Sequence, residues 1–103
     1  MRAVGPGLSQ FGVTSVLTRP TMSVYAQSTG GQPQLIRTNT GWTTEGYTYD
    51  LAVAAQTVAA FPLSANSADC AVVVTVEPGN YTIQVSGVGA TTGEALVEIY
   101  ILP

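Results

Sequence analysis

The sequence contains no histidine and no lysine, and Cys70 is its one cysteine. Without a histidine a Ser-His-Asp triad cannot be built, and one thiol alone does not make a structural zinc site. A single cysteine also excludes a disulfide within the chain. We expect Cys70 to be a small buried apolar group, because no histidine or lysine is present to activate it as a reactive thiol. The sequence therefore predicts no catalytic residues, no zinc and no cofactor.

Charge is scarce as well. Charged residues make up 9% of the chain, against about a quarter in typical globular proteins. The three arginines are scattered and the net charge is −3, whereas a nucleic-acid footprint needs clustered Lys and Arg. No run of residues approaches the roughly 18 apolar residues of a membrane span. We therefore expect neither a nucleic-acid partner nor membrane insertion, and a surface made polar by Ser, Thr, Asn, Gln and Gly.

Apolar residues are plentiful, at 46% of 103 residues, and they recur with the period of β-strands. The clearest pattern lies between Ala71 and Pro103, where two turns separate three strand-like segments. These segments are Ala71–Val76, a β-branched run typical of a buried strand; Tyr81–Val85, which alternates; and Ala95–Leu102, apolar on both faces. We expect the last segment to lie centrally in a sheet, with Glu98 near a rim.

The first half of the chain predicts further strands and one helix. Strands are expected at Arg2–Val4 and Thr21–Ala26, and the latter forms a hairpin with Gln34–Thr38. Phe11 is expected to enter the core. Leu51, Ala54, Ala55, Val58 and Phe61 have helical spacing, with Asp50 as N-cap and Pro62 as the stop.

Together these patterns predict an all-β fold: a single antiparallel β-sandwich, jelly-roll-like, with roughly seven or eight strands. The short amphipathic helix would lie across one end of the sandwich. The chain is long enough for one domain with a modest core, so residues 1–103 are expected to form a single β-sandwich domain.

Three phrases carry a resemblance to a known kind of domain: RAVGPGLSQFGV, RPTMSVY and LSANSADCAVVVTVEPGNYTIQVSGVGATTGEALVEIY. They resemble a β module that recurs in large secreted and surface proteins of environmental bacteria. The resemblance covers nearly the whole chain, and Ser67–Tyr100 is its most specific part. The organisation of Pro20–Tyr25 and Pro78–Val85 is also similar to pre-peptidase C-terminal type domains, accessory β-sandwiches of exported enzymes. The resemblance implies an extracellular or cell-surface location, with any export signal upstream of Met1.

Two departures from the first pattern matter. Members of that family carry an acidic phrase where residues 38–42 here read Thr-Asn-Thr-Gly-Trp, so a calcium site built on the acidic phrase is not carried over. Members also have further β sequence upstream of the position of Arg2. We therefore expect either a trimmed module of a larger secreted protein or a sheet edge that another chain completes.

The segment Asn39–Asp50 concentrates aromatic and acidic side chains, and we expect it to be a long surface loop. Trp42, Tyr47 and Tyr49 could stack on sugar rings, with Asn39 and Glu45 supplying hydrogen bonds. The alternative, which we favour, is that Trp42 folds back to cap the core while the tyrosines lie at the edge of the loop. Polysaccharide is therefore the alternative partner.

Carboxylates in the same segment raise two further hypotheses. Glu45 and Asp50 could form the acid and base pair of a glycosidase, and with Asn39 they could offer oxygens to Ca²⁺. We favour instead a helix cap at Asp50 and a solvated loop charge at Glu45. The leading expectation is a non-catalytic extracellular or surface module, structural or accessory, that forms a homo-oligomer or filament through its sheet edges.

Overall fold

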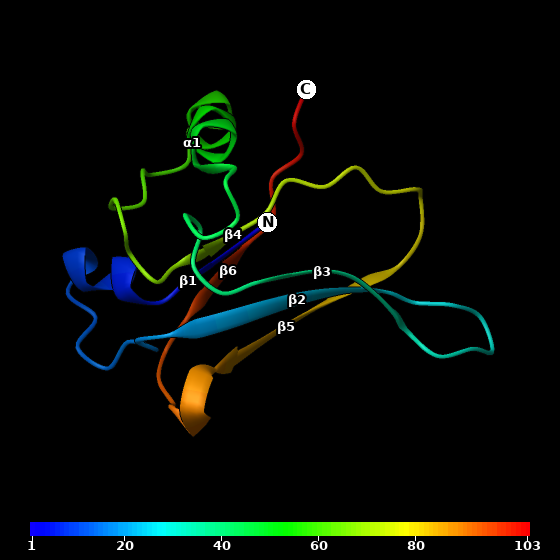
Figure 1. Cartoon of the computed structure of the whole chain (residues 1–103), viewed down its shortest axis with the longest axis horizontal. Helices are drawn as coiled ribbons and strands as arrows, with labels where there is room; N and C mark the ends of the chain where they lie inside the picture. The colour runs from blue at the N-terminus through cyan, green and yellow to red at the C-terminus, as the bar shows by residue number, and fades with distance from the viewer.

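Two three-stranded antiparallel sheets make up most of the molecule, with one α-helix beside them (Figure 1). The computed structural model describes all residues from Met1 to Pro103. The elements are β1 (Arg2–Val4), η1 (Pro6–Phe11), β2 (Pro20–Ala26), β3 (Gln34–Asn39), α1 (Thr48–Thr57), β4 (Cys70–Ala71), β5 (Tyr81–Gly87), η2 (Val88–Ala90) and β6 (Leu96–Glu98). The predicted all-β class with one short helix is confirmed, with six strands in place of seven or eight.

The first sheet has the order β4-β1-β6, and β1 lies at its centre. Arg2 pairs with Ala71 on one side and with Glu98 on the other. All three residues of β1 are buried. The predicted strand at Arg2–Val4 is therefore confirmed, and it is an interior strand of the sheet.

The second sheet has the order β3-β2-β5, with β2 at its centre. Burial along β2 alternates, and Met22 and Val24 are fully buried. The predicted hairpin of residues 21–26 with 34–38 is confirmed, and β5 pairs with the other side of β2 along seven residues. Ile83 and Val85 of β5 pack against the core, which agrees with the predicted half-buried strand.

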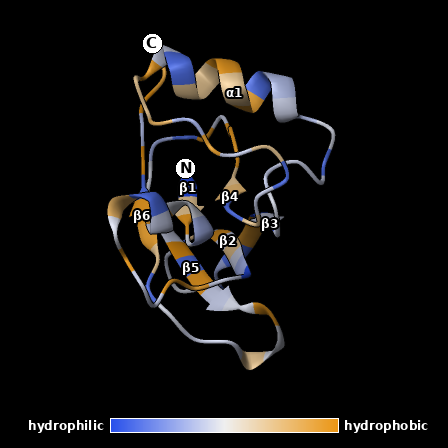
Figure 2. Cartoon of the chain, turned by 90° about the vertical axis from the view of Figure 1, so that its left-hand side faces the viewer, coloured by the Kyte–Doolittle hydropathy of each residue, from blue (hydrophilic) through white to orange (hydrophobic).

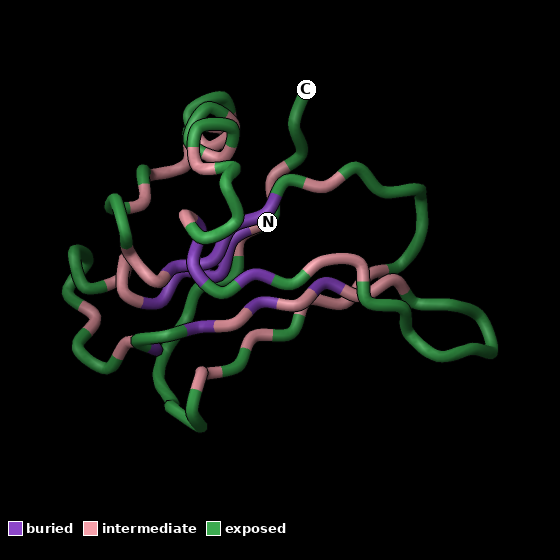
Figure 3. Tube along the Cα trace, in the orientation of Figure 1, coloured by how far each residue is buried: buried purple, intermediate pink, exposed green.

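The core lies between the two sheets. Ala3, Cys70 and Val72 come from the first sheet and its continuation, and Met22 and Val24 come from β2. Figure 3 shows this buried region as a short purple zone where β1, β4 and β2 approach one another. Cys70 is fully buried, as predicted for a small apolar group.

Two of the three predicted C-terminal strands are much shorter than expected. Residues 71–76 form a strand only at β4, and residues 95–102 form one only at β6. The reason is the same for both: pairing with the central strand ends near Met1, so residues beyond Val72 and Glu98 have no neighbouring strand. The prediction that residues 95–102 lie centrally was wrong, because β6 is an edge strand with exposed apolar residues on both faces.

The helix begins two residues before the predicted cap and ends four residues before Phe61. Asp50 lies in the first turn of α1 and is not its N-cap. The helix ends because Ala59 adopts a left-handed conformation (φ 59°), with Ala59 N–H bonded to Gln56 O and Ala60 N–H to Ala55 O. No residue of α1 is buried, and the helix lies apart from the sheets (Figure 2).

Phe11 does not enter the core, which corrects the prediction. It ends the 3₁₀ helix η1 at the surface, where its ring packs edge-on against Phe61 at 5.1 Å between centroids. The loop from Gly5 leads away from the sheet, so the only apolar partner within its reach is another surface ring.

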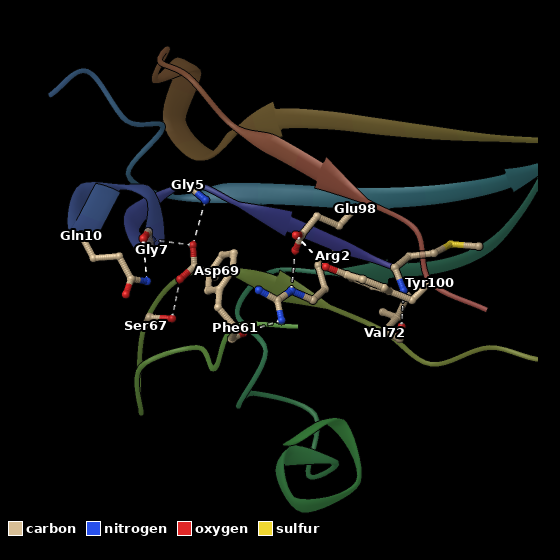
Figure 4. Close-up of polar contacts among 11 residues, drawn as sticks. Arg2, Gly5, Gly7, Gln10, Phe61, Ser67, Asp69, Val72, Glu98 and Tyr100 are labelled. Carbon is tan, nitrogen blue, oxygen red and sulfur yellow. Dashed lines mark hydrogen bonds and ion pairs between the residues drawn. The ribbon is translucent and has the colours of Figure 1, made fainter. Parts of the chain in front are cut away.

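Asp69 fixes the chain where β1 turns into η1, as Figure 4 shows. Its Oδ1 accepts hydrogen bonds from Gly5 N–H (2.8 Å) and Gly7 N–H (3.1 Å), and Ser67 Oγ–H donates to Oδ2 (2.8 Å). The side chain is fully buried. A carboxylate satisfied by three donors can be buried at little cost, and here it holds two glycine amides that would otherwise be unpaired.

We predict that Asp69→Ala lowers the free energy of unfolding by about 3 kcal/mol, because two backbone N–H groups lose their acceptor in a buried site. Urea unfolding followed by circular dichroism measures the change. Asp50→Ala is the control, since this exposed carboxylate interacts only with the first turn of α1 and its loss should cost about 0.5 kcal/mol. Equal effects of the two substitutions would contradict the anchoring role of Asp69.

Candidate functional site

The aromatic residues predicted to bind a ligand do not form a common exposed surface. Trp42 is only 7% exposed, and its indole Nε1–H donates to Ser64 O at 3.1 Å. Its backbone N–H donates to Asp69 O at 2.7 Å. Tyr47 and Tyr49 are exposed, Tyr49 by 80%. The Trp42 ring is therefore part of the packing, as in the favoured alternative, and is not available to stack on a sugar in this arrangement.

Asn39 and Glu45 are linked by hydrogen bonds within the chain. Asn39 is buried, its Oδ1 accepts from Ala71 N–H (3.1 Å), and its Nδ2 donates to Gly41 O (3.0 Å) and to Glu45 Oε2. These bonds tie the end of β3 to β4. Asn39 thus joins the two sheets, and its amide has no group left to offer a ligand.

A hollow of about 430 Å³ brings three of the predicted residues together. Glu45, Tyr47 and Asp50 line it together with Arg37, Leu51, Ala71 and Val73. Arg37 Nη2 lies 3.8 Å from Glu45 Oε1, and both side chains are about one-third exposed, so this ion pair is weak. The chain has no group of three or more His, Cys, Asp or Glu side chains placed to hold a metal ion.

Cys70 is held as a neutral thiol. Its Sγ–H lies 3.1 Å from Pro20 O and 3.2 Å from Asn39 O, inside the core. Burial raises the pKa of this thiol, and the nearby charges of Asp69 and Glu45 act in the same direction. Because the thiolate is the nucleophilic form, the environment of Cys70 suppresses its reactivity.

An ion pair beneath α1 was not anticipated from the sequence. Arg2 Nε lies 2.9 Å from Glu98 Oε1, and both side chains are largely buried. Arg2 Nη1–H also donates to Phe61 O at 2.8 Å, and its guanidinium lies 4.4 Å from the centre of the Phe61 ring. Glu98 thus turns inward from β6 onto Arg2 (Figure 4) and does not lie at a rim. The sequence did contain a signal for this pair: Arg2 and Glu98 are the only charged residues in two otherwise apolar strands, β1 and β6.

Tyr100 adds one more contact to this cluster. Its hydroxyl donates to Glu98 Oε2 at 2.8 Å, and this hydrogen bond raises the pKa of the Tyr100 hydroxyl. The carboxylate of Glu98 therefore has both a cation and a phenol as partners.

An apolar groove of about 420 Å³ lies between α1, residues 71–76 and the C-terminal segment. The groove is lined mostly by apolar side chains, together with Arg2 and Thr75: Met1, Arg2, Leu51, Ala54, Ala55, Val58, Ala71–Val76 and Ile99–Pro103. Several of these are strongly exposed, Ile101 by 86%. In Figure 2 the hydrophobic colouring follows the chain from β6 toward the C-terminus. An open apolar groove of this kind is typical of an interaction surface.

The two segments that flank the groove, residues 73–76 and 99–102, also have unpaired backbone groups. No backbone–backbone hydrogen bond involves residues 73–79 or 99–103. Figure 1 shows the two segments leaving the sheet near the N-terminus in different directions. The groove therefore presents apolar side chains and free N–H and C=O groups, the combination that strand addition uses.

No family model, no curated protein and no solved structure matches this chain. The resemblance to a secreted bacterial β module therefore remains a prediction from the sequence. No helix of the structure has the length and apolarity needed to cross a bilayer.

We predict that Cys70 in the folded protein reacts with a chromogenic disulfide reagent at pH 8 at least about 100-fold more slowly than in urea-unfolded protein. Burial and the raised pKa of the thiol both act in this direction. The absorbance of the released chromophore gives the rate in each state. A native rate close to the unfolded rate would mean that the core around Cys70 opens readily.

Proposed function

We propose that the chain is a non-catalytic structural or accessory module of the extracellular space or cell surface, and that it associates with copies of itself through an open sheet edge. The observation that carries this proposal is the edge strand β6. Natural edge strands are protected by very short length, lysines, prolines or inward-pointing charges. β6 is short, at three residues, but the segment 99–102 that continues it is apolar and unpaired. Leu96 and Val97 are exposed, and the only charge of β6, on Glu98, is neutralised by Arg2.

The low charge of the whole chain supports the same conclusion. With 9% charged residues and no lysine, the surface offers little electrostatic repulsion between copies. The other sheet is better protected, because β3 carries Arg37 at its edge. The scarcity of charged residues and the resemblance of the sequence to secreted β modules support a secreted or surface location as part of this proposal.

We predict that Val97→Lys weakens self-association at least about tenfold, which corresponds to about 1.4 kcal/mol. A lysine on β6 would place a solvated charge where a neighbouring strand must pack. Light scattering over a wide range of protein concentrations gives the association constant, and electron microscopy shows whether the assemblies are discrete or filamentous.

Val53→Lys is the matched control, because Val53 on α1 is 42% exposed and Val97 is 44% exposed. The same substitution on the helix should leave association unchanged. Wild-type protein that stays monomeric at every concentration would remove the basis of the proposed function.

The hollow beside Arg37 supports a second candidate, binding of a polysaccharide. One exposed aromatic ring and two carboxylates meet there, and these groups can stack on a sugar and accept its hydroxyl hydrogens. We predict that Tyr47→Ala abolishes any glycan binding detected by array and calorimetry. Tyr49→Ala should not, since Tyr49 is more exposed but does not line the hollow. Equal losses in the two variants, or no binding by the wild type, would contradict this candidate.

A further inference from the structure

The apolar groove lies on the line of the central strand β1. Met1 and Val72 exchange two backbone hydrogen bonds, of 3.0 and 2.9 Å, so the pairing of β1 with β4 extends one residue upstream. On the other side Arg2 pairs with Glu98, which places Met1 beside Ile99. Continuing both registers, the position before Met1 would face Val73 and Tyr100, and the one before that would face Val74 and Ile101. The groove therefore lies between two walls that diverge from this point (Figure 1), and a strand that paired with both would have to draw them together.

The two walls, Val73–Val76 and Ile99–Leu102, are equal in length and match in character. Both consist of β-branched, aromatic and aliphatic residues without a charge. Neither makes a backbone–backbone hydrogen bond with any other part of the chain. Val73 O accepts one side-chain hydrogen bond, from Arg37 Nη1–H at 3.5 Å. An extended segment placed between them would satisfy the backbone of both walls and cover their exposed apolar side chains.

The groove sets three requirements for its occupant. The segment must be uncharged, because the walls offer no counter-charge, and it must be apolar on both faces. It must also have both backbone edges free. Within this chain the segment Ile99–Leu102 meets all of these requirements, since it is apolar on both faces, unpaired and largely exposed. A second copy therefore carries the complementary strand.

We propose that two copies insert their C-terminal segments reciprocally, so that Ile99–Leu102 of each copy occupies the groove of the other. The proposal rests on self-association, the proposed function, and names its partner and its edge. The resulting sheet has four neighbouring strands. In order, they are Val73–Val76 of the first protomer, Ile99–Leu102 of the partner subunit, Ile99–Leu102 of the first protomer, and Val73–Val76 of the partner subunit. Each C-terminal segment is both wall and occupant. The arrangement closes on itself as an isologous dimer.

The side-chain faces restrict how the segments align. Ala3 and Val74 lie on the core side of the sheet, and Ala3 pairs with Val97, so Ile99 and Ile101 belong to the core side as well. The inserted Ile101 must therefore lie beside Val74 and on the opposite side from Val73. An alignment shifted by one residue would place Ile99 and Ile101 on the side of the sheet opposite the core.

Disulfide trapping between two different variants tests this contact. One chain carries Val74→Cys and the other carries Ile101→Cys, and the mixture is oxidised with oxidised glutathione and analysed by mass spectrometry under non-reducing conditions. We expect the mixed disulfide at a yield at least about fivefold above that of the control pair, Val73→Cys with Ile101→Cys. The control residue is of the same type and in the same wall but faces the other side. Cys70 is left in place because it is buried.

Amide hydrogen exchange of the wild-type chain tests the same proposal without substitutions. Because Val72 forms both bonds to Met1, alternation directs the N–H groups of Val74 and Val76 into the groove and those of Val73 and Thr75 away from it. On association we expect the exchange of the first two amides to slow at least about tenfold, with little change in the other two.

Assembly without the Val74–Ile101 disulfide, and without slower exchange at Val74 and Val76, would overturn reciprocal insertion. Self-association would then proceed through the outer edge of β6, and the proposed function would stand. A strictly monomeric protein would overturn both proposals, and the groove would then suit a strand joined to Met1 or a different polypeptide.

Discussion

The structure depends on a strand of three residues. In the first sheet, β4 and β6 both form hydrogen bonds with Arg2–Val4 and not with each other. All three residues of this central strand are buried. Its registers determine where β4 and β6 begin and end. Because a β-strand is stable only beside a partner, the short reach of β1 limits the whole first sheet. The second sheet is longer, since β2 has partners along all seven of its residues.

Buried charges fix the position of chain segments around this small core. A chain with so few charged residues places three of them, Arg2, Asp69 and Glu98, in largely buried sites. Each is held by specific partners: Arg2 and Glu98 by each other across two strands, and Asp69 by two glycine amides. Such contacts add little net stability compared with apolar packing, but removing one partner is costly. They fix the register of β1 with β6 and the path of the chain from β1 into η1, in regions where few apolar side chains could do so.

Sequence patterns predicted the elements whose partners are local and missed those that depend on distant parts of the chain. The hairpin of residues 21–38 and the strand at residues 81–85 have alternating side chains and clear turns, and both were predicted correctly. Phe11 and Glu98 were misplaced, and the anchoring role of Asp69 was not anticipated, because their partners lie more than 25 residues away in the sequence. The long loop at residues 39–50 suggested a binding surface from its composition, but the burial of Trp42 depends on contacts with Ser64 and Asp69 that no local pattern contains.

The two C-terminal strand predictions failed in a different and more informative way. Residues 71–76 and 95–102 have the composition of interior strands, apolar on both faces, yet most of each segment is unpaired and exposed. Local preference and tertiary position usually agree in natural sequences, and disagreement tends to occur at functional sites. Both segments lose their pairing at the same place, on either side of Met1, so one added strand would give a partner to both. A further strand in the sheet would explain why these two segments have the composition of interior strands but lie at an edge. The uncharged walls of the groove are suited to receive such a strand.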